Sequence, residues 1–118
     1  MKKYSIGLDY GTNSCRALIV DLSDGNEIAS ALFDYLSGES GVLIDHKDPN
    51  LARQNPQDYL DGIASTVTEA ISKAREKKPS FDPETVVGIG VDTTGSSPIP
   101  VNEEGVPLSF LPEFTDNL

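Results

Sequence analysis

Hydrophobic residues near the start of the chain fall into three short runs that polar turn residues separate. The runs are residues 4–9 (YSIGLD), 14–21 (SCRALIVD) and 27–35 (EIASALFDY), and the second is rich in β-branched side chains. Runs of this length and composition predict β-strands. The turns between them, at 10–13 and 23–26, are short, so we expect an antiparallel meander of three strands.

The pattern changes to helical spacing at residues 56–78. Asn55 suits the N-cap, Pro56 suits the first helical position, Asp58 adds an acidic group to the first turn, and Pro79 ends the helix. The apolar residues recur at intervals of three and four, which predicts one apolar face. That face comprises Leu60, Ile63, Ala64, Val67, Ile71 and Ala74.

The remaining segments predict two further strands and a turn. Residues 36–55 contain many helix and strand breakers, and only the run 42–44 (VLI) suits a small edge strand. Residues 85–92 (TVVGIGVD) are almost continuously apolar, which predicts a buried strand covered on both faces. Residues 98–101 lead into a turn at 102–105 and a last short strand or loop. The order β-β-β-α-β-β predicts an α/β fold, a mixed sheet with helix cover.

Charge and composition exclude some classes of function. The 118 residues carry a formal net charge of −10 and a sequence pI of about 4.3, which disfavours nucleic-acid binding. Four basic residues cluster at 73–78, where they suit a helix C-terminus better than a phosphate-binding patch. Cys15 is the only cysteine, so no intrachain disulfide can form. No segment resembles a signal peptide or a membrane span, and we expect a cytoplasmic protein.

The turn after the first strand has the residues of a phosphate-binding site. Asp9 ends the strand, Gly11 permits a tight turn, and small polar residues follow. Their side chains and backbone N–H groups could hold phosphate oxygens, provided that a divalent cation lies between Asp9 and the phosphates. The candidate residues are Asp9, Thr12, Asn13, Ser14 and Arg16. A plain polar hairpin turn is the alternative, and neither a Walker A loop nor a Rossmann fingerprint is present.

A second strand ends in the same way. Asp92 closes the run 85–92, and the small and hydroxyl residues that follow include Gly95 and Ser96. Such residues leave room for a sugar and can bond its hydroxyls, and ligands commonly dock at strand ends. The alternative is a polar turn in which Asp92 accepts from local N–H groups. His46 and Cys15 have no partner that suggests catalysis, and no nucleophile-elbow motif occurs.

Both strand-end motifs resemble the FGGY family of carbohydrate kinases, within the larger actin, Hsp70 and hexokinase group. Residues 4–21 resemble the first phosphate-binding strands of that family. The helix start NPQDY at 55–59 and the segment VVGIGVDTTGSSPIPVNEEGVPL at 86–108 resemble ribulokinases in particular. The resemblance implies a ribonuclease H-like fold. The 118 residues would be the N-terminal part of the first of two domains, with the second domain absent.

The resemblance also implies a reaction and a division of roles. The parent protein would transfer the γ-phosphoryl group of ATP to ribulose, with xylulose, glycerol or gluconate as alternative substrates. Asp9 would hold hydrated magnesium, Thr12, Asn13 and Ser14 would contact phosphates, and Arg16 would support the loop. Gly95 and Ser96 would line the sugar pocket. The catalytic base would lie beyond residue 118, so the chain alone should be inactive, and exposed apolar surface could drive homo-oligomerisation. A non-catalytic scaffold of the same fold is the remaining alternative.

Overall fold

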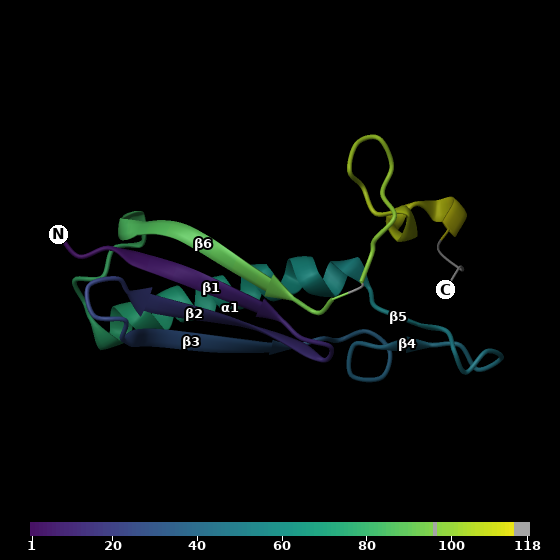
Figure 1. Cartoon of the computed structure of the whole chain (residues 1–118), viewed down its shortest axis with the longest axis horizontal. Helices are drawn as coiled ribbons and strands as arrows, with labels where there is room; N and C mark the ends of the chain where they lie inside the picture. The colour runs from purple at the N-terminus through teal and green to yellow at the C-terminus, as the bar shows by residue number, and fades with distance from the viewer. Residues whose placement is uncertain (96, 115–118) are drawn as a thin grey trace.

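A computed structural model describes residues 1–95 and 97–114, and four strands form its main sheet. Strands β1 (Tyr4–Tyr10), β2 (Ser14–Asp21) and β3 (Glu27–Asp34) make the predicted antiparallel meander. Strand β6 (Val86–Thr93) joins the other side of β1 in parallel, which gives the order β3-β2-β1-β6. Figure 1 shows this sheet with helix α1 (Pro56–Lys77) behind it. The predicted mixed sheet with helix cover is therefore confirmed.

Helix α1 begins and ends where the local signals predict. The Asn55 side chain accepts a hydrogen bond from the backbone N–H of Gln57 at 3.0 Å, and Pro56 occupies the first helical position. Asp58, Arg75 and Lys77 lie in the first and last turns, where their charges suit the helix dipole. The helix carries the chain from β3 to β6, a crossover that parallel strands require.

The buried face of α1 differs from the predicted one. Leu60 and Ala64 are exposed, while Ile63, Val67 and Ile71 are only partly buried. Apart from Pro56 at the helix start, the buried residues recur every four positions and most are small; they are Asp58, Gly62, Thr66, Ala70 and Ala74, of which only Ala74 belongs to the predicted face. Small side chains allow the helix backbone to lie close to β2 and β3, against which it packs. The larger apolar residues therefore flank the contact instead of forming it.

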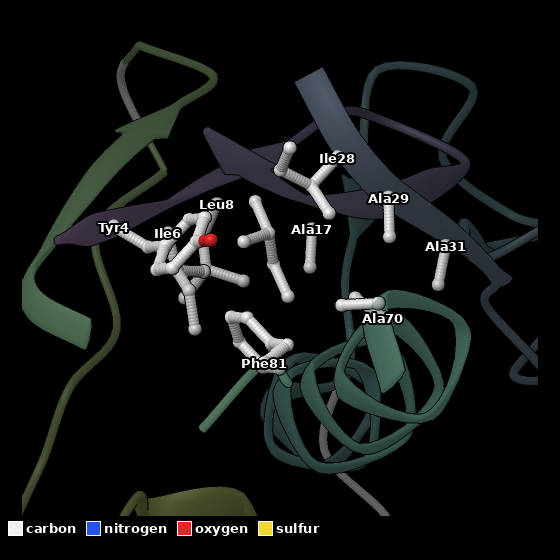
Figure 2. Close-up of a cluster of buried hydrophobic side chains, with 11 residues drawn as sticks. Tyr4, Ile6, Leu8, Ala17, Ile28, Ala29, Ala31, Ala70 and Phe81 are labelled. Atoms are coloured by element: carbon white, nitrogen blue, oxygen red, sulfur yellow. The ribbon is translucent and has the colours of Figure 1, made fainter. Parts of the chain in front are cut away.

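The core lies between the helix-facing side of the sheet and α1. Tyr4, Ile6 and Leu8 of β1 point into it, and Phe81 packs edge-to-face on Tyr4 with ring centroids 5.0 Å apart. Figure 2 shows these side chains with Ala17, Ile28, Ala29, Ala31 and Ala70. An irregularity in the pairing of β2 with β3 brings the consecutive residues Ile28 and Ala29 both into buried positions.

Strand β6 is not buried on both faces as its composition predicts. Val87, Ile89 and Val91 are 55–60% exposed, although Ile89 and Val91 pair with the buried Ile6 and Leu8 of β1. The reason is that α1 lies against β2 and β3, and no other described element covers β6. The strand thus forms an exposed edge of the sheet.

Beyond one end of the sheet the chain is extended. Strands β4 (Leu43–Ile44) and β5 (Ala52–Arg53) pair only with each other, so the run 42–44 does not form an edge of the main sheet. The predicted turn at 102–105 is present, with Gly105 at φ 78°. Short 3-10 turns follow at Leu108–Phe110 and Pro112–Phe114. The radius of gyration, 17.0 Å, exceeds the ~13 Å typical of a compact domain of this length.

Candidate functional site

Strands β1 and β6 run parallel, so their C-terminal ends lie next to each other at the same end of the sheet, as Figure 1 shows. Asp9 and Asp92 are direct partners in this pairing, and Tyr10 pairs with Thr93. The backbone N–H of Thr94 donates to the carbonyl of Tyr10 at 3.1 Å, which continues the contact past the end of β6. The two motifs singled out in the sequence therefore lie side by side.

Asp9 and Asp92 lie on the sheet face opposite the helix. The alternation along β1 buries Leu8 and exposes Asp9, and the register places Arg16 of β2 opposite Asp9. A row of two carboxylates and one guanidinium thus crosses three strands, and all three side chains are exposed. Adjacent like charges disfavour the fold unless an opposite charge is near. This row could bind a cation or the polar groups of a ligand.

The turn from Gly11 to Asn13 is held through its backbone carbonyl groups. The Tyr35 hydroxyl donates to the Gly11 carbonyl at 3.0 Å, and the Gln54 side-chain amide donates to the Thr12 carbonyl at 2.7 Å. The Tyr35 backbone N–H donates to the Asn13 carbonyl at 3.0 Å. In the described part of the chain, the N–H groups of Thr12 and Asn13 donate to no partner. These two N–H groups remain able to bind an anion.

Each predicted phosphate-binding side chain can now be placed. Thr12 and Asn13 are exposed and Ser14 is half-buried at the start of β2. The Asn13 side-chain amide donates to the Ser40 carbonyl at 2.7 Å, so this side chain is engaged with the protein. Arg16 lies on the open sheet face and takes part in none of the ion pairs of the described residues.

Three tyrosines beneath the turn had no sequence signal as a group. The rings of Tyr10 and Tyr35 each meet the ring of Tyr59 at 72°, with centroids 5.3 Å and 5.6 Å away. The Tyr10 hydroxyl donates to the Tyr59 carbonyl at 3.0 Å. Burial raises the pKa of all three phenols, so they are neutral donors at neutral pH. Only the aromatic content of the turn and helix start could have indicated them.

Asp58 connects the helix start to the segment after β3. Its side chain is buried, and its carboxylate accepts from the Ser37 hydroxyl at 3.1 Å and the Ser37 backbone N–H at 3.3 Å. The Asn55 side-chain amide also donates to the Ser37 hydroxyl at 3.1 Å. The sequence predicted Asp58 only as a charge in the first helical turn. The structure shows that Asp58 also ties the start of α1 to Ser37, in the segment after β3.

The second motif is placed only in part. Gly95 is exposed in the turn after β6, where an added side chain would contact nothing, and Ser96 lies outside the described residues. The Thr94 and Ser97 hydroxyl groups are 3.3 Å apart. A hollow on the outer side of α1, lined by Thr68, Ile71, Ser72, Arg75 and Glu76, contains no predicted site residue.

Residues 1–95 and 97–114 contain no group of three or more acidic, histidine or cysteine side chains that could hold a metal ion on their own. A cation at Asp9 would therefore take its other ligands from water or from bound phosphates, as magnesium commonly does.

Within residues 1–95 and 97–114, no helix has both the length and the apolar character needed to cross a membrane.

Comparisons with known proteins identify relatives that cover nearly the whole chain. Residues 4–111 match the family model described as the N-terminal domain of the FGGY family of carbohydrate kinases. A ribulokinase of Vibrio parahaemolyticus is 40% identical over 116 residues, which are 98% of this chain and 20% of that protein. A ribulokinase of Halalkalibacterium halodurans is 39% identical over 123 residues, with the same coverage of each. The chain thus spans about a fifth of the length of these curated relatives.

Solved structures confirm the predicted fold. The xylulose kinase of Rhodospirillum rubrum superposes with a TM-score of 0.66 at 22% identity, over 89% of this chain and 19% of that one. The gluconate kinase of Lactobacillus acidophilus gives a TM-score of 0.68 at 19% identity, over 92% and 19%. At these identities the likeness concerns the fold alone.

Proposed function

Because the chain belongs to the FGGY family of carbohydrate kinases, we propose that it is the N-terminal part of an ATP-dependent kinase that converts ribulose to ribulose 5-phosphate. The observation that carries the proposal is the pairing of Asp9 with Asp92 beside a turn in which the Thr12 and Asn13 N–H groups donate to no described residue. Relatives that share about 40% of the residues and bear the name ribulokinase support the choice of sugar.

The residues at the strand ends fit a nucleotide with magnesium. Two exposed carboxylates would repel phosphate groups unless a cation intervened, and carboxylate with water is a donor set that magnesium accepts. Asp9 would hold the hydrated ion. When bound, magnesium would neutralise charge on the phosphoryl group during transfer.

The turn after β1 would bind the phosphates. The N–H groups of Thr12 and Asn13 face no acceptor in the described chain, and the hydroxyls of Thr12 and Ser14 lie in the same turn. Asn13 would act through its backbone, since its side chain already bonds to Ser40. Arg16 would supply positive charge beside Asp9. These groups position the phosphates, and positioning is most of what phosphoryl transfer requires of a protein.

The turn after β6 would contribute to the sugar site. Gly95 leaves open space next to the strand end, and Ser96 together with its neighbouring hydroxyls would bond sugar hydroxyl groups. The catalytic base would come from the parent protein outside these 118 residues. We therefore expect no phosphate transfer by the 118-residue chain alone.

The test uses the parent polypeptide that carries this chain at its N-terminus. ADP release is measured with magnesium-ATP against ribulose, xylulose, glycerol and gluconate. Preferential turnover of ribulose supports the proposal, and preference for another substrate rejects ribulose but keeps the kinase. A folded protein that turns over none of them contradicts the kinase proposal and favours a non-catalytic scaffold. In the same assay, the 118-residue chain should match a blank without enzyme.

A further inference from the structure

Gln54 joins the start of α1 to the turn after β1. Its side-chain nitrogen donates to the Thr12 carbonyl at 2.7 Å, across 42 positions of sequence. The Tyr59 hydroxyl, one turn into the helix, donates to the side-chain oxygen of the same amide. Both ends of the Gln54 amide are therefore engaged, and the direction of the group is fixed.

Tyr59 is itself held in place. Its ring lies between those of Tyr10 and Tyr35, and its backbone carbonyl accepts from the Tyr10 hydroxyl at 3.0 Å. The Thr12 carbonyl can only accept a hydrogen bond, so the Gln54 NH2 group must face it, and the amide oxygen on the other side accepts from the Tyr59 hydroxyl.

This orientation determines where the turn presents its N–H groups. In a planar trans peptide the C=O and the following N–H point in opposite directions, and the chain contains no cis peptide bond in its described part. When Gln54 draws the Thr12 carbonyl toward the helix, the Asn13 N–H points away from it. The Tyr35 hydroxyl acts in the same way on the Gly11 carbonyl and hence on the Thr12 N–H.

We propose that Gln54, held by Tyr59, is a positioning residue that aims the Asn13 N–H at a nucleotide phosphate. The inference rests on the proposed kinase function, because that function identifies the anion. Under this proposal, residues at the start of α1 support nucleotide binding through the turn and do not contact the nucleotide themselves. A change at Gln54 should weaken nucleotide binding and leave the affinity for sugar unchanged.

Three substitutions in the parent protein separate the parts of this arrangement. Gln54→Leu removes both hydrogen bonds. Gln54→Glu keeps the shape of the side chain but replaces the nitrogen that donates to the Thr12 carbonyl by an oxygen, so two acceptors face each other. Tyr59→Phe removes only the hydroxyl that orients the amide. Gln57→Leu is the matched control, because Gln57 is exposed three residues later and its side-chain amide bonds only within the helix, to Asp61 at 2.8 Å.

Calorimetry measures the affinity for magnesium-ADP, and steady-state kinetics measure KM for ATP and for the sugar. Gln54→Leu and Gln54→Glu should weaken magnesium-ADP binding by about 5- to 10-fold and raise KM for ATP comparably, the size of one or two lost neutral hydrogen bonds. KM for the sugar should stay within about twofold. Tyr59→Phe should have a smaller effect, and adding it to Gln54→Leu should cost little more. Nucleotide binding by Gln54→Leu equal to that of Gln57→Leu overturns the inference.

Hydrogen exchange distinguishes a failure of this inference from a failure of the proposed function. The Gly11 N–H donates to the Ser14 carbonyl at 2.8 Å, and its exchange reports whether the turn is closed without any nucleotide. Peptides covering residues 9–16 should exchange several-fold faster in both Gln54 variants than in Gln57→Leu. If the parent protein binds no nucleotide, the kinase proposal fails while this measurement still decides the role of Gln54. Unchanged exchange in a folded Gln54→Glu protein contradicts the role.

Discussion

Gly62 lies where α1 packs closely against Cys15 of β2, and its replacement by alanine should destabilise the protein. A Cβ atom at this position would lie 2.4 Å from the Cys15 Sγ atom, about 1 Å inside ordinary contact distance. Cys15 is 1% exposed, so its sulfur lies inside the packed interior between β2 and α1. Overpacking of this kind costs roughly 1–3 kcal/mol, whereas alanine in a helix gains about 1 kcal/mol over glycine. We expect Gly62→Ala to lower the free energy of unfolding by up to about 2 kcal/mol.

The same change should have the opposite sign once the sulfur is removed. In a Cys15→Ala background, the nearest remaining atoms to the new Cβ are a Phe33 ring carbon at 3.4 Å and the Cβ of residue 15 at 3.8 Å. Both are ordinary van der Waals contacts, so the helix propensity of alanine should decide. Gly62→Ala should then be neutral or stabilise by up to about 1 kcal/mol. The two sites should be coupled by about 2 kcal/mol.

Urea unfolding followed by circular dichroism measures all four proteins of this cycle. Ala64→Gly on the exposed side of the helix is the control for propensity alone and should cost about 1 kcal/mol. If the changes in unfolding free energy of Gly62→Ala and Cys15→Ala add up in the double variant to within about 0.5 kcal/mol, the close approach at Gly62 is refuted. The result bears on the candidate site, because Cys15 lies two residues after the turn that ends at Asn13, and Gln54 beside the start of α1 bonds to that turn.

Three further changes test other parts of the structure. Asp21 accepts hydrogen bonds from Lys2 and Ser23, which lower its pKa below the usual range, so its contribution is complete above about pH 4 and lost as pH falls further. The stability difference between wild type and Asp21→Asn should shrink between pH 7 and pH 3, and a constant difference would contradict this. Ile89→Lys on the exposed edge of β6 should reduce self-association of the 118-residue chain in sedimentation, and an unchanged mass distribution would argue against that edge. Asn55→Ala should cost about 1 kcal/mol in urea unfolding through the lost helix cap, and no loss would show that the cap is dispensable.

The sequence predicted features that depend on neighbouring residues. The N-cap and proline at the start of α1 act within one turn, and the three strands of the meander are joined by short turns, so both were predicted with nearly correct bounds. Asp9 and Asp92 were recognised separately as strand ends. The sequence did not show that the two pair directly, because their separation is set by the whole crossover through α1.

Features that depend on distant partners were missed or wrong. The apolar spacing of α1 favoured Leu60 and Ala64, which are exposed, whereas the close approach to Cys15 buries a row of mostly small residues that shares only Ala74 with the predicted face. The apolar run in β6 indicates a strand suited to burial, yet it does not show which element covers it. The bond from Gln54 to Thr12 has no local pattern at all, since a glutamine before a helix cap reveals nothing about a turn 42 residues earlier.

The most direct test of the central claim is Asp9→Asn in the parent protein. Asp9 is exposed and takes part in no ion pair of the described chain, so the urea midpoint should hardly change. Turnover of ribulose with magnesium-ATP should fall about 100-fold or more, as when one group that stabilises transition-state charge is removed. Asp34→Asn, also exposed but at the end of β3, should leave turnover unchanged. Full activity of a folded Asp9→Asn protein would contradict the assignment of the magnesium–phosphate site to this strand end.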